Sequence, residues 1–159
     1  MKKIKILFVC LGNICRSPLA EAVFKHKIKA KGIADRFEVD SCGTANYHIG
    51  DTPDPRTIAN ARKNGVSINH LGRQLSERDL EYYDHIFAMD NSNLRNIQAL
   101  PDASKYSDKI RLMRDYDTIG TGSEVPDPYY GHERDFQEVF DILDRSTEAL
   151  IETLTHSKP

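Results

Sequence analysis

The sequence contains few cysteines, no marked excess of either charge and no long hydrophobic run. Three cysteines in 159 residues, an odd number, favour reduced thiols over a framework of structural disulfides. With 22 basic and 24 acidic side chains, the chain has no general attraction for nucleic acid or for an anionic membrane. The apolar run near the N-terminus is far too short for a signal peptide or a membrane span, so we expect a cytoplasmic protein that binds neither partner.

Repeats, linkers and low-complexity segments are also absent, so no domain boundary is indicated. A hydrophobic content of 39% and a charged content of 29% describe a globular protein, and we expect residues 1–159 to form a single domain with a substantial core. Cys10 and Cys15 are not spaced as a zinc pair. Four histidines likewise show no metal-ligand spacing: His26, His85, His132 and His156. We therefore predict neither a bound metal nor another cofactor.

The stretch after the N-terminus has the pattern of a strand, a tight loop and the opening of a helix. The apolar run from Ile6 to Val9 predicts a strand that is buried on both faces of a parallel sheet. Gly12 and Asn13 are residue types that tolerate turns and left-handed conformations. Ser17 is expected to cap the following helix, and Pro18 suits its first position.

A loop between a strand and a helix N-terminus is suited to bind an anion. Its backbone N–H groups turn inward, and the helix dipole adds partial positive charge. Arg16 supplies a planar fork that matches two oxygens of a phosphate. Cys10 is expected at the floor of this loop, where a thiol loses its proton easily and can attack a bound phosphorus. The alternative is a core cysteine that ends a strand and an unrelated surface arginine.

The rest of the chain alternates between predicted strands and helices. Further strands are expected at residues 37–42, 85–89 and 109–113, and helices at 55–64, after the capping-box pattern at 76–79, beyond Asp90 and over 136–154. This alternation indicates a parallel sheet that is covered on both faces, and four strands fit a small flavodoxin-like fold. In such folds ligands bind beyond the carboxyl ends of the strands, which independently places a site at Cys10.

A thiolate phosphatase needs a second group that protonates the leaving oxygen and later activates water. Asp127 is the candidate, because it lies in a long segment whose glycines and prolines exclude regular structure, and such loops are often functional. Pro128 favours an extended conformation at Asp127. The same dipeptide at Asp54-Pro55 is better explained as a helix cap, so the dipeptide alone is not specific.

Two segments resemble motifs of the low-molecular-weight protein tyrosine phosphatases. Residues 10–18 read Cys-Leu-Gly-Asn-Ile-Cys-Arg-Ser-Pro and are followed by Ala20-Glu21, as in the family signature, while Asp127-Pro128-Tyr129-Tyr130 resembles the general-acid loop. The resemblance implies a four-stranded parallel sheet in the order 2-1-3-4. It also implies a monomeric, metal-free enzyme that hydrolyses phosphotyrosine in proteins, and small aryl phosphates, through a cysteinyl phosphate.

The resemblance also assigns individual residues. It makes Cys10 the nucleophile, Arg16 the phosphate-binding arginine and Asp127 the general acid. It implies that the loop holds phosphate or another oxyanion through Leu11, Gly12, Asn13, Ile14, Cys15 and Ser17. Ser41 and His70 match the outer members of a network that steadies the loop, and three tyrosines match the pocket walls: Tyr47, Tyr129 and Tyr130. Each of these residues also has an ordinary interpretation, as a turn, cap, strand-end, loop or surface residue.

Three features bear on specificity and regulation. Aromatic walls around a deep pocket favour phosphotyrosine over the shorter phosphoserine, although Tyr129 and Tyr130 equally suit a self-association patch. Some relatives that act on phosphoarginine carry threonine where this chain has Ile14, which favours the tyrosine branch. Cys15 suggests a reversible disulfide with an oxidised Cys10; the alternative is that Cys15 packs inward.

Two other functions remain open on the sequence. Thioredoxin-linked arsenate reductases share this fold and a similar loop, but their chemistry needs further cysteines downstream, and this chain has none after Cys42. A non-catalytic module that binds phosphorylated proteins would use the same anion-binding loop. Because Cys10, Arg16 and Asp127 are all present, we expect an active phosphatase.

Overall fold

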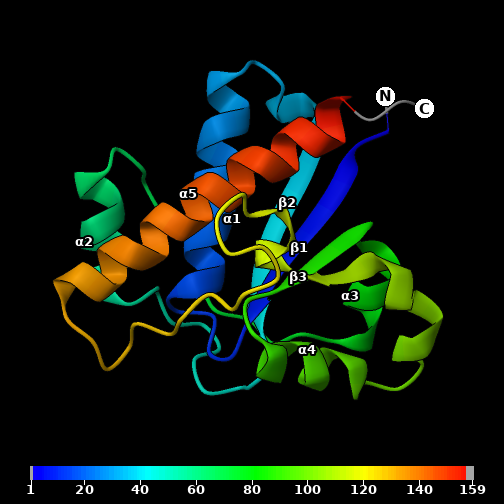
Figure 1. Cartoon of the computed structure of the whole chain (residues 1–159). Coiled ribbons are helices and arrows are strands. Elements are labelled where there is room, and N and C mark those ends of the chain that lie inside the picture. Colours follow the sequence, from blue (N-terminus) through cyan, green and yellow to red (C-terminus); the bar gives the residue numbers. More distant parts are fainter. Residues whose placement is uncertain (1, 157–159) are drawn as a thin grey trace.

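The computed structural model describes residues 2–156 and contains one four-stranded sheet. All strand pairs are parallel, and the strand order is β2-β1-β3-β4, as predicted. The strands are β1 (Ile4–Cys10), β2 (Phe37–Gly43), β3 (His85–Ala88) and β4 (Ile110–Leu112). The central position of β1 places its carboxyl end, with Cys10, beside the ends of two neighbouring strands (Figure 1).

Within residues 2–156, five α-helices flank the sheet. They are α1 (Arg16–Ala30), α2 (Pro55–Lys63), α3 (Glu77–Tyr82), α4 (Asn91–Gln98) and α5 (Glu133–His156). Short 3-10 turns occur at 34–36, 103–109 and 113–116. In Figure 1, α1 and α5 cross on one side of the sheet, and α3 and α4 lie on the other. Among residues 2–156, none of the helices has the length and apolar character needed to cross a membrane.

The side chains of β1 explain how one strand organises both layers. Ile6 and Phe8 belong to a hydrophobic cluster with residues of α1 and α5. Leu7 and Val9 belong to a second cluster with residues of α3 and α4. This alternation is the two-residue period of a strand, and the burial of all four residues confirms the prediction of a strand covered on both faces. The same period places Cys10 on the side of α1 and α5.

The start of α1 differs from the prediction. The helix begins at Arg16 with Cys15 at the N-cap, so Ser17 and Pro18 occupy its second and third positions. The prediction that Ser17 caps the helix was wrong because its hydroxyl bonds instead to Cys10 and Asn13. The predicted cap of α2 is confirmed, since the side chain of Asp54 accepts a hydrogen bond from the backbone of Arg56 at 2.8 Å.

Candidate functional site

A cavity of about 290 Å³ lies at the carboxyl end of β1. It is lined by Cys10, Leu11, Gly12, Ile14, Cys15, Arg16, Tyr47, His48, Asp127, Tyr129 and Tyr130. The fold thus brings the loop after β1 together with a segment more than a hundred positions further along the chain. Cys10, Arg16 and Asp127 share this one cavity, at the edge of the sheet where ligands bind in open α/β folds.

Cys10 is almost fully buried, and its sulfur lies beside the hydroxyl of Ser17. Its Sγ lies 3.0 Å from Ser17 Oγ, and that hydroxyl accepts a hydrogen bond from Asn13 Nδ2 at 2.8 Å. Because the oxygen of Ser17 is already an acceptor, its hydrogen is free to point at the sulfur or at the carbonyl of Cys42, 3.3 Å away. A hydrogen bond donated to sulfur stabilises the thiolate, which is the nucleophilic form.

The side chain of Asn13 fixes the shape of the loop. Its backbone has φ 58, a left-handed conformation that asparagine tolerates better than most residues. Its amide donates to Ser17 and, at 3.1 Å, to Ser41. Its oxygen accepts from His70 Nε2 at 2.7 Å and from the backbone of Arg73 at 3.1 Å. Every hydrogen-bonding position of the amide is therefore occupied, and the structure brings together the four residues that were predicted to form a network.

Arg16 is buried at the wall of the cavity with its charge retained. Its Nη1 donates to Asp90 Oδ2 at 2.8 Å and to the carbonyl of Val125 at 3.0 Å. Its Nη2 lies 3.7 Å from Asp127 Oδ2. Burial by itself lowers the pKa of Arg16, but the negative charges of Cys10, Asp90 and Asp127 raise it above its ordinary value. These contacts position a charged guanidinium beside the loop that follows β1.

Asp90 was not foreseen as a site residue. One of its carboxylate oxygens caps α4 by accepting from the backbone of Asn93 at 2.7 Å, and the other binds Arg16. The available signal was its position two residues beyond the end of β3, because the carboxyl ends of neighbouring parallel strands meet at one edge of the sheet.

Asp127 reaches the cavity from the irregular segment before α5. Its Oδ1 accepts from the backbone of Tyr129 at 3.1 Å, while its Oδ2 faces Arg16. The side chain is 48% exposed, so water and a leaving group can both reach it. One oxygen is thus held by the loop, and the other is available for proton transfer.

Aromatic side chains form the rim of the cavity. Tyr129 and Tyr130 meet edge to face with ring centroids 4.9 Å apart, and Tyr47 packs in the same way on His48 at 6.5 Å. Tyr130 is 95% exposed and Tyr47 is 70% exposed, so these rings stand at the mouth rather than at the floor. His48 was not identified as a site residue from the sequence, although it follows Tyr47 directly.

The other two cysteines have a protonated thiol at neutral pH. Burial raises the pKa of Cys15 to about 12, and burial also raises the pKa of Cys42 far above its ordinary value. Cys42 lies in the cluster on the opposite face of the sheet from Cys10, which agrees with its interpretation as a small core residue. Cys15 lines the cavity, and its disulfide with Cys10 stays a hypothesis.

A buried carboxylate anchors the segment that carries Asp127. Asp117 is fully buried and accepts hydrogen bonds from Arg145 Nε at 2.9 Å, Arg145 Nη2 at 3.0 Å and Arg114 Nε at 2.8 Å. Arg114 in turn donates to the carbonyl of Glu124 at 3.0 Å. Val125 then bonds through its own carbonyl to Arg16. The anchor on α5 is thus linked along this segment to Arg16 in the cavity.

Replacement of Asp117 by asparagine is expected to destabilise the protein by about 3 kcal/mol, because it leaves two arginines without their buried partner. The melting temperature should fall by roughly 6–12 °C, measured by calorimetry against Asp102→Asn, which makes the same change at an exposed site. The arginines hold the pKa of Asp117 below 3.8 despite its burial, so its contribution is complete above that pH and is lost as the pH falls through the lowered pKa. If the difference in melting temperature between Asp117→Asn and Asp102→Asn stays constant as the pH falls into strong acid, this assignment is contradicted.

The fold and this site have close counterparts among known proteins. Residues 5–159 match the family model described as low molecular weight phosphotyrosine protein phosphatase. A relative of that name from Schizosaccharomyces pombe is 48% identical over 141 residues, which cover 87% of this chain and 89% of the relative. The crystal structure of a protein tyrosine phosphatase from Entamoeba histolytica matches with a TM-score of 0.91 and 42% identity, covering 96% of this chain and 97% of that one.

A Drosophila arginine phosphatase is also similar, with a TM-score of 0.88 and 32% identity over 98% of this chain and 100% of its own. The range matched by the family model includes the loop at Cys10 and the segment at Asp127, and the relative from Schizosaccharomyces pombe also covers most of the sequence. The chain therefore belongs to the low molecular weight phosphotyrosine protein phosphatase family.

Proposed function

We propose that this chain hydrolyses phosphotyrosine in proteins, and small aryl phosphates, through a phosphate ester of Cys10. The observation that carries the proposal is the meeting of a buried cysteine, a buried arginine and an exposed aspartate in one cavity of about 290 Å³. Inorganic phosphate and other oxyanions are expected to compete for the same loop. We further propose that the chain works as a single-domain monomer in the cytoplasm, where thiols stay reduced.

In the first step the thiolate of Cys10 attacks phosphorus, and the bond from phosphorus to the tyrosine oxygen breaks. Arg16 and the backbone N–H groups of the loop bind the phosphoryl oxygens as charge develops on them. The departing phenolate takes a proton from Asp127. This step requires a protonated Asp127 together with an ionised Cys10, and the hydroxyl of Ser17 favours the ionised sulfur.

In the second step water displaces the sulfur from phosphorus. Asp127, now ionised, accepts a proton from that water and returns to its acid form, while Cys10 leaves as a thiolate. Inorganic phosphate is the product. The whole cycle uses side chains of this sequence and calls for no redox change.

The aromatic rim supports a phenyl phosphate as substrate. A phosphotyrosine side chain is long enough to bring its phosphorus to a buried sulfur while its ring passes between aromatic walls. The direct test is the release of phosphate from matched phosphotyrosine and phosphoserine peptides by the purified chain with EDTA present. Hydrolysis of the first alone is the expected result, and equal rates on both peptides contradict the substrate assignment.

The two alternatives lack a supporting observation. The part of the chain that follows Cys42 has no cysteine to accept the oxidising equivalents of arsenate reduction. A purely binding module needs no general acid, yet Asp127 is directed toward Arg16 in the cavity. Both observations support turnover of a phosphate ester.

Phosphoarginine is the competing substrate, because the similar Drosophila protein is an arginine phosphatase. Ile14 lines the cavity, at the loop position where the resemblance implies threonine in some relatives that act on phosphoarginine. We expect Ile14→Thr to raise the ratio of phosphoarginine to phosphotyrosine turnover by about tenfold, measured as kcat/KM on paired peptides. Ile14→Val is the matched control, since valine has the shape of threonine without its hydroxyl. An equal change in both variants would assign the effect to size rather than to polarity.

A further inference from the structure

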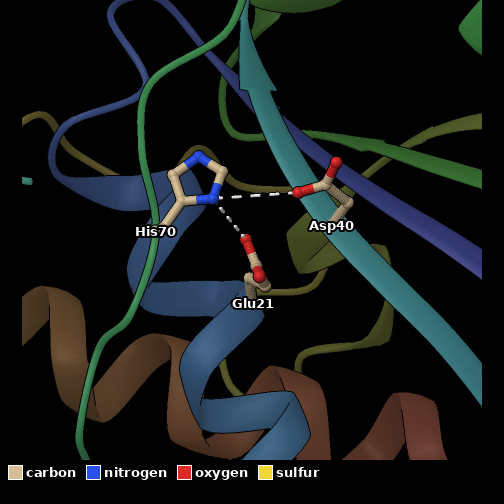
Figure 2. Close-up of side chains that lie close together, drawn as sticks. All are labelled: Glu21, Asp40 and His70. Atoms are coloured by element: carbon tan, nitrogen blue, oxygen red, sulfur yellow. Dashed lines mark ion pairs between the residues drawn. The ribbon is translucent and has the colours of Figure 1, made fainter. Parts of the chain in front are cut away.

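Three side chains from distant segments converge beside the phosphate loop, outside the catalytic cavity. Glu21 lies on α1, Asp40 on β2 and His70 in the segment between α2 and α3. His70 Nδ1 is 3.2 Å from Glu21 Oε1 and 3.7 Å from Asp40 Oδ1, and Figure 2 shows both carboxylates directed at this one nitrogen. The donor atoms of the three residues all lie within 4.8 Å of one another.

The hydrogen-bond network determines which nitrogen of His70 carries a proton. The amide of Asn13 donates to Ser17 and Ser41, so its oxygen faces His70 Nε2, 2.7 Å away. Nε2 is therefore the donor, and in a neutral ring the lone pair is on Nδ1. That lone pair would face two carboxylate oxygens in a nearly buried position, which is unfavourable unless a cation lies between them.

The distances around Nδ1 suit a metal ion as well as a proton. A four-coordinate zinc ion with bonds near 2.0–2.1 Å holds neighbouring ligand atoms about 3.3 Å apart. The observed separations of 3.2 and 3.7 Å are close to this value. The two carboxylate oxygens lie within 4.8 Å of each other, and a movement of Glu21 and Asp40 toward the ion would complete such a geometry.

The surroundings also have the pattern of an outer coordination shell. A ligating histidine usually donates its other ring N–H to a fixed oxygen, as His70 does to Asn13. Lys25 binds Glu21 Oε2 at 2.6 Å, and Arg73 binds Asp40 Oδ2 at 2.8 Å. These cations hold the far oxygen of each carboxylate. The near oxygens lie toward Nδ1, and that of Glu21 also accepts a hydrogen bond from the hydroxyl of Ser41 at 2.7 Å.

The cluster is accessible from one side. A cavity of about 400 Å³ borders Glu21 and His70, and Asp40 is 32% exposed. We propose that Glu21, Asp40 and His70 bind a divalent cation of the zinc class, which replaces the proton on His70 Nδ1 and releases it to water. A water molecule from the cavity supplies the fourth ligand. The three residues are far apart in the sequence, so no spacing rule could reveal the site, and it amends the prediction that the chain binds no metal.

The test titrates zinc chloride into the Cys10→Ser protein, in which the nucleophilic thiol cannot bind the ion. Calorimetry should give one equivalent, and the imidazole resonances of His70 should shift while those of the other histidines do not. Asp40→Asn and Glu21→Gln in the same background should each weaken binding by at least about tenfold. His26→Gln is the matched control, because His26 lines the same cavity outside the cluster and should leave binding unchanged.

Each variant is first compared with its parent by circular dichroism. If Glu21→Gln fails to fold, Asp40→Asn carries the test, because Asp40 is the more exposed of the two carboxylates. No binding up to about 1 mM zinc overturns the proposal and leaves a proton as the only cation on Nδ1. Binding that leaves His70 unshifted, or that survives Asp40→Asn, overturns it as well. None of these outcomes bears on phosphate hydrolysis, so the two proposals are tested separately.

Discussion

Replacement of Cys10 by serine is expected to lower the rate of aryl phosphate hydrolysis by roughly 10⁴-fold or more. A serine hydroxyl stays protonated in this site and cannot attack phosphorus as a thiolate does. Phosphate binding should survive, because Arg16 and the backbone N–H groups of the loop are unchanged. The measurement is single-turnover hydrolysis with EDTA present, paired with a phosphate-binding titration.

Cys42→Ala is the matched control for this change. Cys42 is buried in the cluster on the opposite face of the sheet, so its loss should lower stability slightly and leave the rate per folded molecule unchanged. Rapid quenching of the wild-type reaction should also trap phosphate on Cys10 and on neither of the other cysteines. Activity that survives in Cys10→Ser contradicts the whole mechanism.

The same experiment separates catalysis from simple binding. A wild-type protein that binds phosphate but releases none from an aryl ester would be a binding module. The geometry argues against that outcome, because the hydroxyl of Ser17 lies 3.0 Å from the sulfur of Cys10 and can donate to it. A module that only binds anions has no need of a stabilised thiolate.

The sequence predicts the layers of this fold better than the limits of its elements. Strand β1 was predictable because burial against two clusters, one on each face of the sheet, requires a continuous apolar run. Helix α5 was predictable because its apolar residues repeat on one face. The start of α1 was not predictable. The hydroxyl of Ser17 could bond either to the amides of its own helix or to the side chains of Cys10 and Asn13, and it bonds to the side chains. Tertiary contacts determine which of these hydrogen bonds forms, and a local sequence pattern carries no information about such contacts.

The catalytic candidates were predictable to the extent that they lie in continuous motifs. Asp90 and Asp117 were missed because their partners come from distant segments. Arg16, in the segment that follows β1, binds Asp90, which lies beyond the end of β3. Arg145, on α5, binds Asp117. Asp90 also has a local role that accounts for its presence in the sequence, since one of its oxygens caps α4. Its other oxygen binds Arg16, and the local pattern does not reveal this contact.

Replacement of Asp127 by asparagine should slow the first step by about 10²–10⁴-fold, the usual contribution of a positioned general acid. The loss should grow with the basicity of the leaving group: small for an activated nitrophenyl ester and large for phosphotyrosine itself. Asparagine keeps the shape of the side chain and an acceptor for the backbone of Tyr129. The loop should therefore keep its conformation, and the binding of phosphate should not weaken.

Two measurements distinguish this role from a structural one. The wild-type dependence of kcat/KM on pH should fall at high pH as the acid loses its proton, and that fall should disappear in Asp127→Asn. Asp141→Asn, an exposed change on α5 away from the cavity, should keep the wild-type profile. A uniform loss of rate for all leaving groups with an unchanged pH profile would assign Asp127 to holding Arg16 through their 3.7 Å contact, and the proton would then have to come from water.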